Sequence, residues 1–140
     1  MPDHIEAYVH GEGKAGALVH FRCREDMTPR TPEFRALAHD IAMHVVALKP
    51  AAVSPEKLDE YLWQKELGHI NRALQGADTP TRQARLIEQR KKFENETCLL
   101  RQPFLKDPSK SVGQVVVELS AQLSDTIIVL RFTRYDANGI

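Results

Sequence analysis

The chain has 140 residues, 42% hydrophobic and 27% charged, which is typical of a globular protein with a sizeable core. Basic and acidic residues number 19 each, so the formal net charge of zero argues against a dedicated nucleic-acid binder. No apolar run approaches the roughly 20 residues of a membrane span, and the N-terminus lacks the basic start and apolar core of a signal peptide.

These features predict a single domain over residues 1–140, in a cytoplasmic protein. The two cysteines, Cys23 and Cys98, lie far apart and form no CxxC pair, which fits a reducing compartment. We expect Cys98 to lie in a helix as a small core residue.

Two strands open the chain. Residues 5–10 alternate with period two, and residues 17–23 form a second apolar strand. The glycines of residues 11–16 suit a hairpin loop. They also match GxGxxG, but that dinucleotide-binding motif needs a helix after the glycines, and here a strand follows.

The second strand runs into a short polar loop, residues 24–30. A helix start follows, in which Thr31 can cap and Pro32 has its φ already set for the first helical position. A loop fixed at both ends has little freedom, so we expect Asp26 and Met27 at its tip to point outward. Because loops on rigid scaffolds often carry function, we interpret this tip as an element that inserts into another protein.

Three helices should follow. The first ends at residues 49–50, the second runs from residue 54 to about residue 75, and the third from residue 79 to about residue 100. The second and third should fold back as an antiparallel pair with a largely solvated third helix. The expected apolar seams are Phe34, Leu37, Ala38, Ile41, Ala42, Val45 and Leu48 in the first helix, Trp63, Leu67, Ile70 and Leu74 in the second, and Leu86, Ile87, Phe93, Thr97 and Leu100 in the third.

Residues 99–110 break the helical pattern with two prolines. Ser111 then caps a fourth helix, where Gln114 can complete a capping box, and residues 127–135 form a third, β-branched and aromatic strand. The predicted fold class is α+β: a three-stranded antiparallel sheet with helices packed on one face, plus the antiparallel helical pair.

The last strand looks apolar on both faces near its start. Ile128, Leu130 and Phe132 alternate with Ile127 and Val129. Helices can cover only one face of the sheet, so a second copy of the chain is the simplest cover for the other, and we expect a homodimer. The alternative is an ordinary exposed apolar edge.

The sequence offers little for catalysis. His39 and His44 diverge on a helix, and Asp40 with His44 gives two ligands rather than a metal site, so we expect a solvated or partner-facing pair and no metal or cofactor. Cys23 has no histidine at a diagnostic spacing. The basic run 82–92 has interleaved acids and few aromatics, which favours a solvated face over RNA. We therefore expect no enzyme activity.

Several short segments stand in order along nearly the whole chain: residues 5–11, 40–43, 50, 53–54, 92–93, 98–100, Gln102-Pro103-Phe104, Lys106-Asp107-Pro108-Ser109-Lys110-Ser111-Val112, and residues 131–135. Together they resemble the core domain of bacterial translation elongation factor Ts. The Gln-Pro-Phe followed by Lys-Asp-Pro-Ser-Lys-Ser is the most specific part, whereas the opening hairpin alone would not identify the family.

The resemblance implies a guanine nucleotide exchange factor that promotes GDP release from elongation factor Tu, a GTPase. In the family, the loop after the second strand usually reads Thr-Asp-Phe-Val-Ala-Arg, and its acid and aromatic disturb the magnesium site near the switch region. Here Asp26 and Arg30 keep their types, Met27 replaces the aromatic and Glu25 replaces the threonine. The implied partner-binding residues are thus Asp26, Met27, Arg30 and Glu25, with His10 and Arg22 as weaker candidates.

The family also begins with a small helical domain similar to ubiquitin-associated domains, whereas this chain starts just before its first strand. We expect either a piece of the core or a shortened relative that pairs as a dimer. Two functional hypotheses stay open: an exchange factor, or a dimeric binding or scaffold module without exchange activity. No membrane and no direct nucleic-acid contact is expected in either case.

Overall fold

The computed structural model describes residues 1–138 and has an α+β fold, as the sequence predicts. Short 3-10 turns occur at Thr28–Arg30, Pro55–Lys57 and Leu99–Arg101. The main elements in chain order are β1 (Asp3–His10), β2 (Ala15–Arg22), α1 (Pro32–Leu48), α2 (Glu60–Ala73), α3 (Thr79–Thr97), β3 (Pro103–Phe104), β4 (Asp107–Ser111), α4 (Val112–Gln122) and β5 (Ile128–Asp136).

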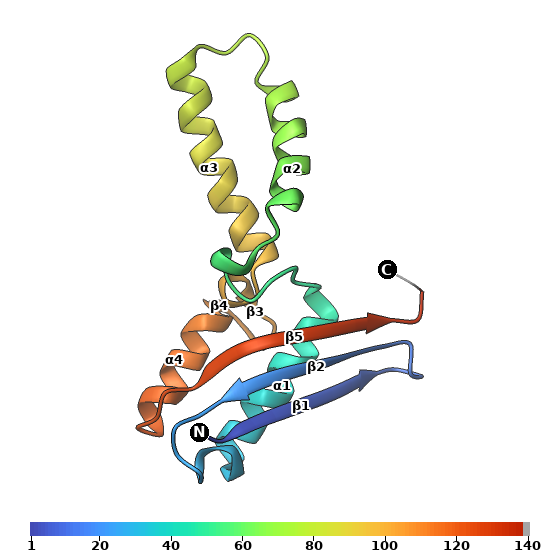
Figure 1. Cartoon of the computed structure of the whole chain (residues 1–140), viewed down its shortest axis with the longest axis vertical. Coiled ribbons are helices and arrows are strands. Elements are labelled where there is room, and N and C mark those ends of the chain that lie inside the picture. Colours follow the sequence, from blue (N-terminus) through green and yellow to red (C-terminus); the bar gives the residue numbers. More distant parts are fainter. Residues whose placement is uncertain (139–140) are drawn as a thin grey trace.

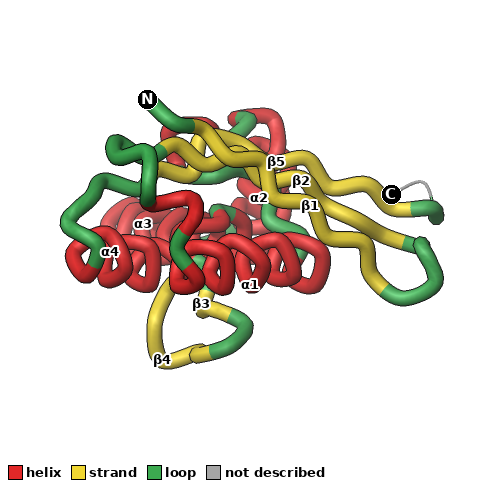
Figure 2. Tube along the Cα trace, turned by 90° about the horizontal axis from the view of Figure 1, so that it is seen from below, coloured by secondary structure: helices red, strands yellow, loops and turns green. Residues whose placement is uncertain are grey.

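The antiparallel sheet has the order β1-β2-β5, which makes β2 the central strand. Helix α1 packs along one face of it, and α4 lies beside α1 on the same side of the sheet, as predicted (Figure 2). Strand β1 has an inverted pattern: its half-buried side chains are His4, Glu6 and Tyr8, whereas Ile5 and Val9 are exposed. The sheet therefore turns apolar residues away from its own helices at this edge.

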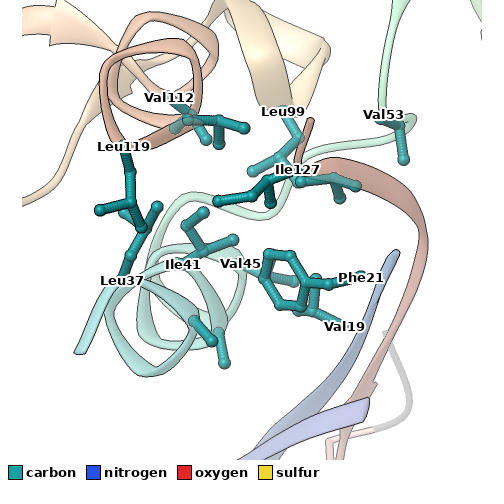
Figure 3. Packing of buried hydrophobic residues seen from close by; sticks show 14 of the residues in the cluster. Val19, Phe21, Leu37, Ile41, Val45, Val53, Leu99, Val112, Leu119 and Ile127 are labelled. Carbon is teal, nitrogen blue, oxygen red and sulfur yellow. The ribbon is translucent and has the colours of Figure 1, made fainter. Parts of the chain in front are cut away.

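The core lies between β2, α1, α4 and the start of β5 (Figure 3). Val19 and Phe21 point from β2 toward Ile41 and Val45 of α1, and all four are fully buried. Full burial of each such side chain is worth about 1.5–3 kcal/mol. The predicted apolar face of α1 is confirmed except at its last member, since Leu48 is 40% exposed.

One expected face assignment in β5 is wrong. The register between β2 and β5 shifts at His20/Phe21, so that Val19 pairs with Phe132 and Phe21 pairs with Val129. Val129 and Phe132 therefore both pack on the core side, although strict alternation places them on opposite faces. An irregularity of one residue inverts the alternation, and sequence periodicity cannot locate it.

Helices α2 and α3 form the antiparallel pair and project away from the sheet as an arm (Figure 1). The start and end of this pair differ from the prediction. Residues 55–57 form a separate 3-10 turn, and Asp59 caps α2 by accepting from Tyr61 N at 3.0 Å. Helix α3 ends at Thr97, so Cys98 is its extended C-cap rather than a helical residue, although it is buried as expected.

The expected seam of the arm holds in part. The α2 seam is confirmed, with Ile70 buried and Trp63 half-buried, and no side chain of α3 is fully buried. Ile87, however, is 72% exposed and lies outside the seam. The aromatic contact between Trp63 and Phe93, with ring centroids 5.3 Å apart, joins the two helices near the base of the arm.

A small hairpin, β3–β4, was not expected from the two prolines of residues 99–110. It is held by His44, which is fully buried, so the expectation of a solvated or partner-facing His44 is wrong. His44 Nε2 donates to Gln102 Oε1 at 2.8 Å, and His44 Nδ1 accepts from Leu105 N at 3.1 Å. Burial lowers the pKa of His44, while the hydrogen bond to Gln102 acts in the opposite direction.

Candidate partner-binding site

The loop that follows β2 lies at one end of the sheet, beside the turn between α4 and β5 (Figure 1). At its start, Cys23 N donates to Pro2 O at 2.9 Å. At its end, the Thr31 side chain accepts from Phe34 N at 3.2 Å and donates to Thr28 O at 2.8 Å, which confirms the predicted cap. The loop is thus fixed at both ends by hydrogen bonds.

The middle of the loop is held by Asp125, from the turn before β5. Its Oδ1 accepts from Arg24 N at 2.9 Å. Its Oδ2 accepts from Glu25 N at 3.2 Å and from Thr28 Oγ1 at 2.5 Å. Thr126 N donates to Oδ1 as well. One carboxylate therefore joins two segments about a hundred residues apart in the sequence.

Burial raises the pKa of Asp125, but the hydrogen bonds from Thr28, Arg24, Glu25 and Thr126 outweigh it and leave the pKa below its ordinary value. The carboxylate is therefore ionised at neutral pH. Sequence reasoning missed this residue. The only local signal is a polar Ser-Asp-Thr stretch before an apolar strand, which reads as an ordinary turn.

The four predicted contact residues, Glu25, Asp26, Met27 and Arg30, are all exposed. The Met27 side chain is 64% exposed, which is unusual for a large apolar residue on a loop fixed in this way. Thr28, the residue after Met27, turns inward and is buried. The loop thus exposes an acidic side chain, Asp26, next to an apolar one, Met27. Their role in binding stays a prediction.

The two weaker candidates do not join this loop. His10 lies at the other end of β1, by the β1–β2 turn, where Tyr8 Oη and His10 Nδ1 are 2.8 Å apart (Figure 1). Arg22 forms a two-pronged ion pair with Asp3, Nε to Oδ1 at 2.8 Å and Nη2 to Oδ2 at 3.0 Å.

Burial raises the pKa of Cys23 to about 11, with Asp125 and Asp3 adding to the effect, so its thiol is protonated at neutral pH and is a poor nucleophile.

The sheet face opposite the helices is a second candidate surface, called the outer face below. Its apolar members are exposed: Leu18 by 51%, Ile5 by 52% and Val9 by 66%. Beside them, His20 Nε2 is 2.8 Å from Asp3 Oδ2, and Arg131 Nε donates to His20 Nδ1 at 3.3 Å. The outer face therefore combines an apolar area with a network of charged residues.

Within residues 1–138, no group of three or more histidine, cysteine or acidic side chains is placed to hold a metal ion. No helix in that same part of the chain has both the length and the apolar character needed to cross a membrane. The geometry presents two surfaces suited to contacts with other proteins, the loop tip and the outer face.

The family model described as elongation factor TS matches residues 2–138. An elongation factor Ts of Rubrobacter xylanophilus is 40% identical over 136 residues, which cover 94% of this chain and 69% of that relative. Relatives of the same name from Desulforamulus reducens and Koribacter versatilis are 37% and 36% identical, over 94% and 97% of this chain. The chain spans only 62% and 63% of the length of these two relatives.

Proposed function

This chain belongs to the elongation factor Ts family, and from that premise we propose that it promotes the release of GDP from elongation factor Tu. The observation that supports this function is the pairing of exposed Asp26 with exposed Met27 on a loop fixed at both ends and in its middle. Such a loop can insert into a partner without losing further conformational entropy, because it is already ordered.

The physical basis of exchange is linkage. A protein that binds the nucleotide-free GTPase more tightly than the GDP-bound form must weaken GDP binding by the same factor. Asp26 would act near the bound magnesium ion, often the largest local charge in such a site. Met27 would gain apolar contacts only after the switch element of the GTPase has moved, and its flexible side chain can adapt to an irregular pocket.

The test is the release of a fluorescent GDP analogue from purified elongation factor Tu. The wild-type chain should accelerate release, and Asp26→Ala and Met27→Ala should each lower the acceleration about tenfold, the equivalent of one lost contact of roughly 1.4 kcal/mol. Glu88→Ala, the loss of an exposed acid on α3, is the matched control and should leave release unchanged. Unaltered release in both loop variants would exclude this site.

The second candidate function is a binding or scaffold module that has lost exchange activity. Met27 favours it, because methionine lacks the rigid ring that the family usually carries at this position. A stable complex with elongation factor Tu on a sizing column, without faster GDP release, would support this function. Faster release would exclude it.

We also propose that two copies pair through the outer face. Ile5, Val9 and Leu18 are exposed there, while α1 and α4 cover only the opposite face. Burying apolar surface contributes about 25 cal/mol per Å², so this area favours a second copy. Leu18→Asp should reduce the sedimentation mass from two chains to one, whereas Val117→Asp, at an exposed valine of α4, should not. A wild-type mass of one chain at micromolar concentration would contradict the pairing.

A further inference from the structure

We propose that Asp125 is the positioning residue for the Asp26–Met27 loop, and that it sets the efficiency of nucleotide release without contacting the GTPase itself. This inference rests on the proposed exchange function. It concerns a residue outside the loop, far from it in sequence, which the loop nevertheless depends on for its conformation.

The hydrogen bonds of Asp125 use its full capacity. A carboxylate has about four lone-pair sites, two on each oxygen. Oδ1 accepts from the amides of Arg24 and Thr126, and Oδ2 accepts from the amide of Glu25 and the hydroxyl of Thr28. Four donors on four sites leave no acceptor free for a partner's cation or donor. Asp125 is therefore suited to hold the loop rather than to bind a ligand.

The donors come from the residues that decide where the loop tip points. Arg24 and Glu25 directly precede Asp26, and Thr28 directly follows Met27. Hydrogen bonds on both sides of the tip fix the backbone direction at Asp26 and Met27 while leaving both side chains exposed. Apart from the bond between Cys23 N and Pro2 O at its start, the other hydrogen bonds of the loop are local, such as Thr28 N to Glu25 O at 3.2 Å and Arg30 N to Met27 O at 3.0 Å. These could persist in a loop that swings as a unit.

Asp125 is itself held in place by its own surroundings. It follows Ser124, which adopts the left-handed conformation with φ of 51°, and its amide donates to Ser120 O of α4 at 2.9 Å. Two residues after it, Ile127 is buried in the core, and the Ile127 amide donates to Ser120 Oγ at 3.1 Å. The anchor thus belongs to the rigid body of the protein, and hydrogen bonds to a charged acceptor are stronger than neutral ones.

Loss of the anchor should act through preorganisation. A loop free to swing samples many directions, and only a fraction of them can enter the partner, so each productive encounter costs more conformational entropy. Asp125→Asn keeps the size of the side chain but replaces one acceptor oxygen by a donor, which cannot accept from Glu25 N. Asp125→Ala removes both oxygens. We expect nucleotide release to fall about tenfold in the alanine variant and by a smaller factor in the asparagine variant.

The experiment measures two properties of the full chain. The first is hydrogen exchange at the Arg24 and Glu25 amides: both should lose protection in Asp125→Ala, and the Glu25 amide should lose it in Asp125→Asn. The second is the dependence of GDP release from elongation factor Tu on the concentration of the chain. A loosened loop should raise the half-saturating concentration and lower the maximal rate together. Val45→Ala, a cavity in the core away from the loop, is the destabilised control and should alter neither property below its unfolding temperature.

A double-mutant cycle separates positioning from general destabilisation. Thr28→Val removes the hydroxyl donor but keeps the shape of the buried side chain. It should reduce release about threefold in the wild-type background and have almost no further effect in the Asp125→Ala background, since residues of one network are not additive. Fully additive losses would overturn the positioning role.

The outcomes distinguish this inference from the function on which it rests. If the wild-type chain accelerates release and Asp125→Ala stays within about twofold of it, the positioning role is wrong while the exchange function stands. If the wild-type chain gives no acceleration, the exchange function fails and the inference falls with it. Support requires an active wild type, a loss in Asp125→Ala with exposed loop amides, and an unaffected Val45→Ala.

Discussion

The body of the protein and its helical arm are held together by different means. The body buries Phe21, Phe34 and Ile41 completely between the sheet and α1. The arm, α2 with α3, has Ile70 as the single buried side chain among its described helical residues and depends on half-buried aromatic and ionic contacts. Arg90 illustrates this, with ion pairs to Glu60 and Glu94 and its guanidinium 5.1 Å from the Trp63 ring.

This difference shows where stability and adaptability reside in the chain. The candidate loop and the outer face both belong to the body, so their geometry rests on the best-packed part of the molecule. The arm has few buried contacts, and such regions open locally at a lower free energy than the whole domain. Substitutions in the body should therefore act globally, and substitutions in the arm should act locally.

The largest expected effect comes from Phe34→Ala in the body. Phe34 is fully buried and makes edge-to-face contacts with Phe21 at 5.4 Å and His4 at 5.3 Å. The cavity should lower the free energy of unfolding by about 3–5 kcal/mol, measured by urea denaturation. Ile87→Ala, at an exposed position of the arm, is the control. A similar loss in both variants would remove the distinction between body and arm.

Gln102→Ala should have the next largest effect, because Gln102 joins the two regions. Its amide accepts from His44 of α1 and donates to Glu96 O of α3 at 2.8 Å. Truncation leaves the buried His44 Nε2 without its acceptor and the part-buried Glu96 O without its donor, and should cost about 1–3 kcal/mol. Hydrogen exchange should show faster opening at the α3 end of the arm. Gln83→Ala, at an exposed glutamine of α3, should change neither the free energy of unfolding nor the hydrogen exchange of the arm.

Trp63→Ala should have a smaller and purely local effect. It removes the aromatic contact with Phe93 and the cation–π contact with Arg90, together worth about 1–2 kcal/mol. Amides of α2 and α3 should exchange faster, while those of β2 and α1 keep their protection. Tyr61→Ala, an aromatic loss at a 66% exposed position, is the matched comparison. Loss of protection in β2 would mean that the arm supports the body.

The smallest expected effect is a change in the pH dependence of stability. The pKa of Asp125 is below its ordinary value of 3.8 in the folded protein, so its ionised form favours folding. That contribution is complete above pH 3.8 and is lost as the pH falls through the lower folded pKa. Asp125→Asn should therefore show a shallower decline of the unfolding free energy in acid. An unchanged slope would show that the carboxylate is not held as the structure implies.

The sequence predicted the elements of the body well because their signals are local. The apolar strand near residues 17–23, the apolar spacing of α1 and the Ser111–Gln114 capping box each follow from a few neighbouring residues, and all three are present. The β3–β4 hairpin was missed because its prolines read as a simple break. It forms only because His44 and Gln102, 58 residues apart, meet in the core.

The candidate site divides in the same way. The exposure of Asp26 and Met27 followed from the polar loop and the Thr31 cap, and Leu18 on the outer face follows from the alternation of β2. The role of Asp125 could not be inferred, since no neighbouring residue in the sequence indicates a contact with a loop a hundred residues earlier. The register shift at His20/Phe21 could not be predicted from the sequence either.

By itself, the order of residues determined the α+β class, the approximate positions of the four helices and of the three strands of the main sheet, the solvated character of α3, and membership in the family through segments spread along the chain. Only the tertiary structure decided which face Phe132 takes, that His44 is buried, and that one carboxylate from the last turn holds the exposed loop. The physical reason is the separation in sequence over which each interaction acts. Periodicity and capping act between residues a few positions apart, whereas hydrogen bonds and packing between distant segments exist only once the chain has folded.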